Sequence, residues 1–315
     1  MNPFWRLIWT MLAAAALPAF AQEIHGAGAT FPAPVYAKWA EAYKAATGIS
    51  IRYDAVGSGE GIARIRNGEV DFGATDVPLT GAELDAAHLE QFPGVIGGVV
   101  PVVNIAGVKP GALKLTGAVL AEIYLGHARK WNDKAIADLN PDIALPRSNI
   151  TVAHRGDASG SSFLWTSYLS DASPEWKSTV GAGTHVAWPA GVAGVGNEGV
   201  ASYVQRTRFS LGYVEYAYAK AHRLSDAALF DKDGNAVQAS ADAFRATRWP
   251  ITGASFILVP THADRSAAVV AFFDWALHHG QPIAESLDYV PISADEVERI
   301  VARWNQRIPS LRSKP

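Results

Sequence analysis

Short runs of β-branched and aromatic residues alternate with amphipathic helical stretches along most of this 315-residue chain. Such alternation is typical of α/β layering, in which helices cover a largely parallel sheet, so we expect an α/β fold. The expected strands are residues 51–56, 70–74, 95–105, 150–155, 211–219 and 256–259, and the expected helices are 34–47, 58–66, 159–169, 198–206, 269–278 and 295–304.

The chain is long enough for two domains of ordinary size. Two of the β-rich runs, near Val99 and near Phe256, are suited to cross from one lobe to the other. The N-terminal and C-terminal segments would then share a lobe. We expect one lobe to comprise residues 22–100 plus 257–315, and the second lobe to comprise residues 101–256.

The N-terminus has the pattern of a secretory signal peptide. Arg6 precedes a mostly apolar run, and Ala19 and Ala21 supply the small residues that a signal peptidase reads. A membrane anchor is the alternative, but the run is short for a full span. We expect residues 1–21 to be removed by cleavage after Ala21, which leaves a soluble periplasmic protein with no direct membrane insertion.

The charge and cysteine content narrow the classes of function. The formal net charge is −3, so no basic excess indicates a nucleic-acid partner. Any bound anion must therefore be held by local geometry, because the overall field is slightly repulsive. The chain has no cysteine, so we expect an exported protein that is stabilised by its core alone.

Four segments place Gly, Ser or Thr where a predicted strand gives way to a helix or a turn. They are GAGATFP at 26–32, GSGEG at 57–61, TD at 75–76 and HRGDASGSSF at 154–163. Glycine lets backbone N–H groups approach a ligand, and a helix N-terminus adds unpaired donors and a positive dipole end. Several such ends brought together could hold a small oxyanion. Taken singly, each is equally compatible with turn chemistry, with Ser58 and Ser159 as helix caps.

Enzyme and cofactor signatures are incomplete. Gly-X-Ser-X-Gly does not occur around Ser159, and the nine His residues show no metal-ligand spacing. In the Gly26-X-Gly28 stretch, Phe31 stands where a dinucleotide fingerprint needs its third Gly. We therefore expect no enzyme activity, no cofactor and no metal site.

The chain resembles the periplasmic phosphate-binding proteins of phosphate-specific ABC transporters, the PstS family. The resemblance is carried in order by GAGATFPAPVYAKWAEAY, VGSGEGIARI, VDFGATDVPLT, FPGVIGGVVPVVN, HRGDASGSSFLWTSYLS, GNEGVASYVQR, WPITGASFILV and FFDWA. It implies a two-lobed, type II periplasmic binding protein with two hinge crossings. It further implies a monomer that captures inorganic phosphate between its lobes and delivers it to an inner-membrane ABC phosphate permease.

The resemblance also implies a set of phosphate ligands. The matching positions are Thr30, Phe31, Ser58, Asp76, Arg155, Asp157, Ser159, Gly160 and Ser161. Backbone N–H groups and hydroxyls would donate to phosphate, and Arg155, oriented by Asp157, would bind two of its oxygens. Asp76 would accept a hydrogen bond from protonated phosphate and thereby exclude sulfate, which carries no proton. The alternative for Asp76 is an ordinary turn cap after a strand.

Three features depart from the family. Ser161 stands where Thr is usual. His154 occupies a position that is often a basic residue in the family, and a histidine there predicts a pH-sensitive cleft rim. The segment at residues 242–249 is shorter than the corresponding segment in the family, and we expect it to lie in the second lobe, away from the ligand. Two other functions remain open: a secreted phosphatase, and a binding protein for another oxyanion such as sulfate, molybdate or arsenate.

Overall fold

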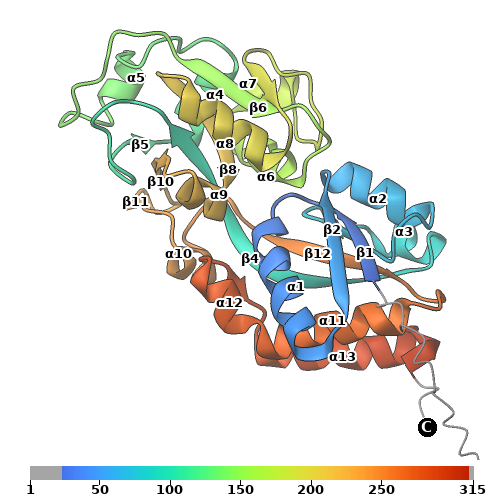
Figure 1. Ribbon diagram of the computed structural model, residues 1–315. Coiled ribbons are helices and arrows are strands. Elements are labelled where there is room, and N and C mark those ends of the chain that lie inside the picture. Colours follow the sequence, from blue (N-terminus) through green and yellow to red (C-terminus); the bar gives the residue numbers. More distant parts are fainter. Residues whose placement is uncertain (1–22, 312–315) are drawn as a thin grey trace, which may run out of the picture.

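The computed structural model describes residues 23–311, and it has two α/β lobes (Figure 1). The predicted fold class is thereby confirmed. The predicted signal peptide and its cleavage after Ala21 lie outside the described residues. Within the described range, none of the helices combines the length and the apolar character that crossing a bilayer requires.

The first lobe is built on four adjacent strands. In spatial order they are β2 (Ser50–Ala55), β1 (Glu23–Gly28), β3 (Phe72–Thr75) and β12 (Thr252–Pro260). The first three are parallel to one another, and β12 is antiparallel to β3. Because the carboxyl ends of parallel strands meet at one edge, Thr30, Ser58 and Asp76, which follow β1, β2 and β3, are brought to the same edge.

Helices cover both faces of this sheet. They are α1 (Ala33–Thr47), α2 (Ser58–Arg66), α3 (Gly81–Ala86), α11 (Ser266–His279), α12 (Gln281–Ser286) and α13 (Ala294–Arg307). Aromatic rings fill the layer under α1 and α11: the centroid of Phe273 lies 5.0 Å from that of Phe72 and 5.8 Å from that of Tyr36. Tight aromatic packing of this kind holds the strand ends in fixed positions.

The second lobe repeats the parallel arrangement on a smaller scale. Its strands are β8 (Ser210–Glu215), β6 (Thr151–Arg155) and β7 (Val192–Gly194), and its larger helices are α4 (Gly117–Tyr124), α6 (Gly160–Ala172), α7 (Pro174–Thr179) and α8 (Gly196–Arg206). Trp165 stacks on Tyr213 at 4.8 Å between centroids, inside a cluster of buried aromatic side chains. This core supports the end of β6, where Arg155 lies.

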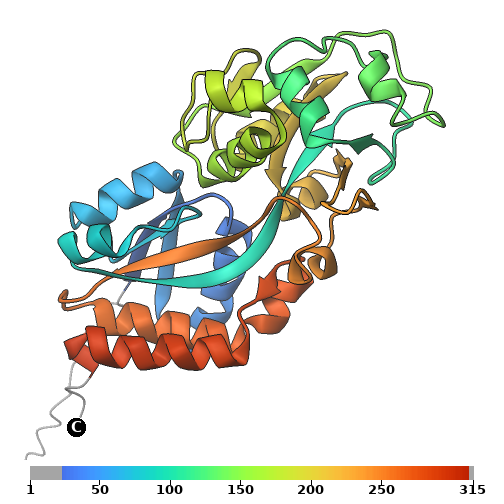
Figure 2. The ribbon, with the colours of Figure 1, turned by 180° about the vertical axis from the view of Figure 1, so that it is seen from behind.

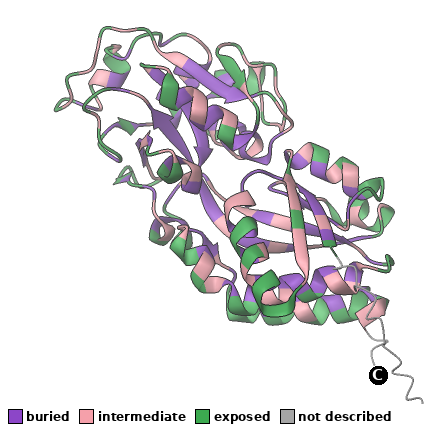
Figure 3. Ribbon diagram, in the orientation of Figure 1, coloured by how far each residue is buried: buried purple, intermediate pink, exposed green. Residues whose placement is uncertain are grey.

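One long strand, β4 (Leu89–Val103), runs through both lobes (Figures 1 and 2). Its residues 89–98 pair with β12, whereas residues 99–103 pair with β8. The ten strands therefore form one continuous sheet, and β4 is buried along most of its length, including its passage between the lobes (Figure 3). The predicted lobe limits, 22–100 plus 257–315 and 101–256, stay a prediction.

Short elements complete the chain. They are β5 (Lys114–Leu115), α5 (Lys134–Ala137), α9 (Tyr216–Ala221), β9 (Ser225–Asp226), β10 (Ala228–Phe230), β11 (Ala236–Val237), α10 (Ala241–Arg245), β13 (Val290–Pro291) and the 3-10 turn Pro309–Leu311. The segment at residues 242–249 packs against β4, where the Trp249 indole donates a hydrogen bond to the Val99 carbonyl at 2.9 Å.

One strand prediction is wrong at its end. Residues 211–219 were expected to be extended, but β8 ends at Glu215 and helix α9 begins at Tyr216. The Glu215 carboxylate accepts a hydrogen bond from the Ala217 N–H at 2.8 Å and so caps the helix. The cap satisfies the Ala217 N–H, and the apolar pattern from which the strand was predicted does not reveal such a helix start.

Candidate functional site

Two helix N-termini, one from each lobe, meet at the edge where the parallel strands end. The Gly160 N–H, at the start of α6, donates to Ser58 Oγ at 3.1 Å, and Ser58 is the first residue of α2. Alongside, the Gly59 N–H donates to the Ala158 carbonyl at 3.0 Å. Both helices direct their positive dipole ends to this point, which favours negative charge there. We call the surrounding residues the cradle: Thr30, Phe31, Ser58, Asp76, Arg155, Asp157, Ser159, Gly160 and Ser161.

The hydroxyls of Ser58 and Thr30 are both saturated as acceptors. Ser58 Oγ accepts from the Asp76 N–H at 3.2 Å as well as from Gly160. Thr30 Oγ1 accepts from the Asn197 backbone N–H at 3.2 Å and from its amide nitrogen at 2.8 Å. A hydroxyl has two lone pairs and one proton, so each group has only its proton left to share. Both side chains are therefore set to donate, which suits an anionic ligand.

The start of α6 supplies further hydroxyls. Ser159 caps the helix by accepting from the Ser162 N–H at 3.1 Å. Ser161 Oγ is buried and has no hydrogen-bond partner among the described residues. An unpaired buried polar atom costs about 1–3 kcal/mol, so a group with acceptor oxygens at this point would relieve the penalty.

Arg155 is the buried cation of the cradle, with 2% of its surface exposed. Its guanidinium forms a fork with Asp157: Nε donates to Oδ1 at 2.7 Å, and Nη2 donates to Oδ2. Asp157 Oδ1 also accepts from the Gly196 N–H at 3.0 Å. Burial raises the pKa of Asp157, but the hydrogen bond and charge of Arg155 outweigh it, and the net pKa is lowered. Two of the five guanidinium N–H groups are used by Asp157, which leaves three.

Asp76 is buried, and its two carboxylate oxygens have different surroundings. Oδ1 accepts from the Ser255 hydroxyl at 2.8 Å. Oδ2 faces the start of α6, since a Cβ on Gly160 would lie 2.6 Å from it and 2.7 Å from Ser58 Oγ. Position 160 must therefore be glycine for the two lobes to approach this closely. Burial raises the pKa of Asp76 to about 7, against the opposing effects of the Ser255 hydrogen bond and the Arg155 charge.

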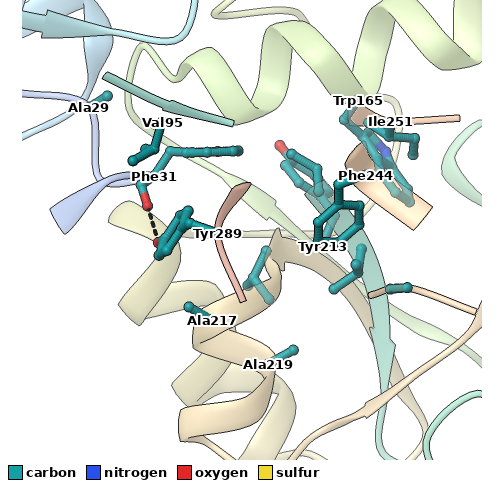
Figure 4. Packing of buried hydrophobic residues seen from close by; sticks show 14 of the residues in the cluster. Ala29, Phe31, Val95, Trp165, Tyr213, Ala217, Ala219, Phe244, Ile251 and Tyr289 are labelled. Atoms are coloured by element: carbon teal, nitrogen blue, oxygen red, sulfur yellow. Dashed lines mark hydrogen bonds between the residues drawn. The ribbon is translucent and has the colours of Figure 1, made fainter. Parts of the chain in front are cut away.

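Phe31 and His154 lie at the margins of the cradle. The Phe31 carbonyl accepts from the Tyr289 hydroxyl at 2.7 Å, and its ring packs near that of Tyr289 (Figure 4). The prediction that His154 lines a pH-sensitive rim is wrong. His154 is buried and stacks on Trp188, with 4.8 Å between ring centroids, because neighbours on a strand point to opposite faces and Arg155 takes the cradle side. Burial lowers the pKa of His154, so its ring is neutral at pH 7.

Asn197 and Ser255 are among the residues that contact the cradle and were missed from the sequence. Asn197 follows Gly196 in GNEG, which has the same Gly-rich helix start as GSGEG at residues 57–61, so a local signal was present. Ser255 lies in the middle of β12, and nothing in its local sequence marks it. It becomes a site residue only because β12 pairs beside β3, which ends just before Asp76.

One group of potential metal ligands lies elsewhere, on α4 and α7. His127 contacts Glu122 through Nδ1 at 3.2 Å and Glu175 through Nε2 at 3.7 Å. His127 and Glu175 are exposed, and each imidazole nitrogen is already directed at one of the two carboxylates. This arrangement is therefore better described as a surface bridge between charged side chains than as a metal site.

Comparison with known proteins places the chain in a family. The PBP superfamily domain matches residues 13–279. The phosphate-binding protein PstS of Pasteurella multocida is 48% identical over 95% of this chain and 94% of its own length. The phosphate-binding protein PstS of Haemophilus influenzae is 47% identical over 91% and 94%, respectively.

A solved structure shares the fold. It is that of a putative phosphate ABC transporter substrate-binding protein with bound phosphate from Clostridium perfringens. It superposes with a TM-score of 0.69 at 20% identity, covering 86% of this chain and all of that one. At this identity the likeness concerns the fold alone.

The raised pKa of Asp76 predicts a pH-dependent cost in stability. With a pKa of about 7 when folded and 3.8 as its ordinary value, the folded state keeps a proton that the unfolded state releases. The contribution of Asp76 to stability is complete below about pH 4 and is lost as the pH rises to 7, by up to about 4 kcal/mol. In urea unfolding without phosphate, the free energy of unfolding of Asp76→Asn relative to that of the wild type should therefore rise by up to about 4 kcal/mol between pH 4 and pH 9. A difference that stays constant with pH would contradict the raised pKa.

Proposed function

The chain belongs to the PBP superfamily and, within it, to the PstS family of phosphate-binding proteins, and from this membership we propose that it binds inorganic phosphate in the periplasm for delivery to an inner-membrane ABC permease. The observation that carries the proposal is the cradle itself. Hydroxyl protons, two helix N-termini and one guanidinium from both lobes surround a single buried carboxylate. This donor-rich set suits a small tetrahedral anion.

We propose the following contacts. Arg155 binds two phosphate oxygens through the N–H groups that Asp157 leaves unused. Thr30, Ser58 and Ser159 donate through hydroxyls whose lone pairs already accept backbone hydrogen bonds, and the unpaired Ser161 hydroxyl joins them. The Thr30 and Phe31 N–H groups and the first turn of α6, including Gly160, complete the donor set.

Asp76 gives the site its selectivity in this proposal. Ser255 occupies Oδ1, so Oδ2 is the oxygen that faces the ligand. Because the pKa of Asp76 is about 7, the carboxyl group and phosphate can share one proton in the hydrogen bond between them. Sulfate has no proton to offer, so wherever Asp76 is ionised the two groups would face each other as acceptors, which costs several kcal/mol.

We further propose that the protein binds phosphate without chemical change. Catalysis at a phosphate ester would need an activated nucleophile or a metal-bound water. Among the described residues, no cradle hydroxyl is hydrogen-bonded to a histidine, and the nearby His154 stacks away from the ligand side. Incubation of the protein with a model phosphomonoester tests this directly, and steady release of phosphate would contradict it.

The primary test is calorimetric titration of the purified protein with phosphate and, separately, with sulfate. Tight binding of phosphate with weak or undetectable binding of sulfate is the expected result. A protein that binds neither anion, or that prefers sulfate, would refute the proposed function.

The role of Asp76 predicts a distinctive pH profile for sulfate. In the wild-type protein, sulfate binding requires protonated Asp76, so its affinity should fall by up to about tenfold per pH unit above pH 7. In Asp76→Asn, the amide can donate to sulfate at any pH, so binding should be stronger and nearly flat between pH 6 and 9. A variant that rejects sulfate as strongly as the wild type would disprove the proton-reading role.

Arg155→Ala should weaken phosphate binding by about 2–5 kcal/mol, because a buried, bidentate charged contact is lost. Arg245→Ala is the matched control, since it removes the same charge from α10, where Arg245 pairs with the exposed Asp242 at 2.8 Å. Calorimetry on both variants should find the loss only for Arg155. Equal affinities in the two variants would remove Arg155 from the site.

A further inference from the structure

Three tyrosine hydroxyls hold three successive backbone carbonyls just after β1. The donor and acceptor pairs, with their oxygen–oxygen distances, are Tyr53 and Ala29 (2.7 Å), Tyr218 and Thr30 (2.8 Å), and Tyr289 and Phe31 (2.7 Å). The tyrosines come from β2, from α9 and from the turn before β13. Figure 4 shows the last of the three bonds. A short segment is thus held from three separate parts of the fold.

Each of these bonds also fixes the direction of an N–H group. In a trans peptide, the carbonyl of one residue and the N–H of the next point to opposite sides, and the described chain contains no cis peptide. The bond from Tyr53 to the Ala29 carbonyl therefore directs the Thr30 N–H, and the bond from Tyr218 to the Thr30 carbonyl directs the Phe31 N–H. Each N–H points away from the tyrosine that holds its peptide.

The third tyrosine differs in this respect. Tyr289 holds the Phe31 carbonyl, but the following residue is Pro32, which has no N–H. The segment therefore offers two oriented donors, those of Thr30 and Phe31. The Tyr289 hydroxyl has another partner as well, Glu215 Oε2 at 2.9 Å, which ties it to the end of β8.

The oriented segment also contacts the other side of the cradle. Thr30 Oγ1 accepts two hydrogen bonds from Asn197, and a Cβ on the adjacent Gly196 would lie 3.2 Å from Thr30 Cγ2. Gly196 in turn donates to Asp157, the partner of Arg155. The two N–H groups thus belong to a segment that is connected through Gly196 and Asp157 to the buried guanidinium.

The tyrosines are suited to act as permanent donors. Burial raises the pKa of Tyr53, of Tyr218 and of Tyr289 above the ordinary value. Their hydroxyls therefore stay protonated at neutral pH and above. A hydroxyl that keeps its proton holds a carbonyl under all these conditions.

We propose that Tyr53 and Tyr218 are positioning residues for phosphate, which orient the Thr30 and Phe31 N–H groups toward the anion by holding the carbonyls of the same peptide units. This proposal rests on the proposed function. Tyr218 belongs to α9, next to β8 of the second lobe, and Thr30 follows β1 of the first lobe. The Phe31 donor is therefore fixed in direction only while the two lobes are together, which makes part of the site a product of closure.

The first test is phosphate affinity in conservative variants. Tyr53→Phe and Tyr218→Phe remove one hydroxyl each, and either should raise the Kd for phosphate roughly tenfold, as expected for a lost hydrogen bond that aligns a ligand donor. Tyr124→Phe is the matched control: its hydroxyl is buried and also donates to a backbone carbonyl, that of Ala153 at 3.1 Å, outside the cradle. This control should keep the wild-type Kd within about twofold, with a comparable fall in the unfolding midpoint.

The second test separates orientation from general loosening. In the phosphate-bound protein, the amide proton of Phe31 should move upfield in Tyr218→Phe while that of Thr30 stays in place. In Tyr53→Phe, the amide proton of Thr30 should move upfield while that of Phe31 stays in place. A merely structural defect would move both amide signals together, or neither, in two-dimensional ¹H–¹⁵N spectra.

The outcomes are distinct. A wild-type protein that does not bind phosphate would refute the proposed function and this proposal with it. Wild-type binding with unchanged Kd in both variants, with a loss equal to that of Tyr124→Phe, or with no crossed pattern in the amide signals, would overturn the tyrosine proposal alone.

Discussion

The burial of charge in the cradle is the constraint on which the arrangement of the site depends. Arg155, Asp157 and Asp76 lie together where the lobes meet, and an isolated ion there would be strongly disfavoured. The fork between Arg155 and Asp157 cancels one charge against another. Asp76 is left without a cation of its own, and a pKa near 7 lets it shed its charge. The cradle is thus nearly neutral before any ligand enters, and dipoles and hydroxyl protons must attract the anion.

The fold supplies those dipoles by bringing chain ends together. The parallel strands of the first lobe place Thr30, Ser58 and Asp76 at one edge of their sheet, and those of the second lobe place Arg155 at the end of β6. The aromatic layers beneath these strands resist displacement. Strand β4 joins the two sheets into one, with its pairing partner changing from β12 to β8 after residue 98. Among the described residues, β4 is the strand whose pairing passes from one lobe to the other, so a hinge motion there would leave the pairing within each lobe intact.

Local sequence signals predicted the parts of the site that are local in the chain. Ser58 begins α2 and Ser159 caps α6, as the Ser/Gly pattern indicates, and the α/β class follows from the alternation of elements. The position of His154 was also within reach, since it alternates with Arg155 on β6. Ser255 and Tyr218 were not, because their contacts join residues 179 and 188 positions apart and depend on strand order and lobe placement. No periodicity in a sequence records which distant strand will lie beside β3.

The use of neutral donors also bears on release. A transport protein must give up its ligand, and groups that are hard to rehydrate or hard to separate would slow this step. In the proposed site, separation of the lobes would let hydroxyl and amide protons exchange the anion for water at small net cost, since each net hydrogen bond contributes about 0.5–1.5 kcal/mol. Arg155 keeps Asp157 as its partner on the same lobe, so the buried cation is not left unpaired. In the proposed site, Arg155 would make the largest single contribution to affinity, and the hydroxyl and amide contacts, which need both lobes, would be lost together when the lobes separate.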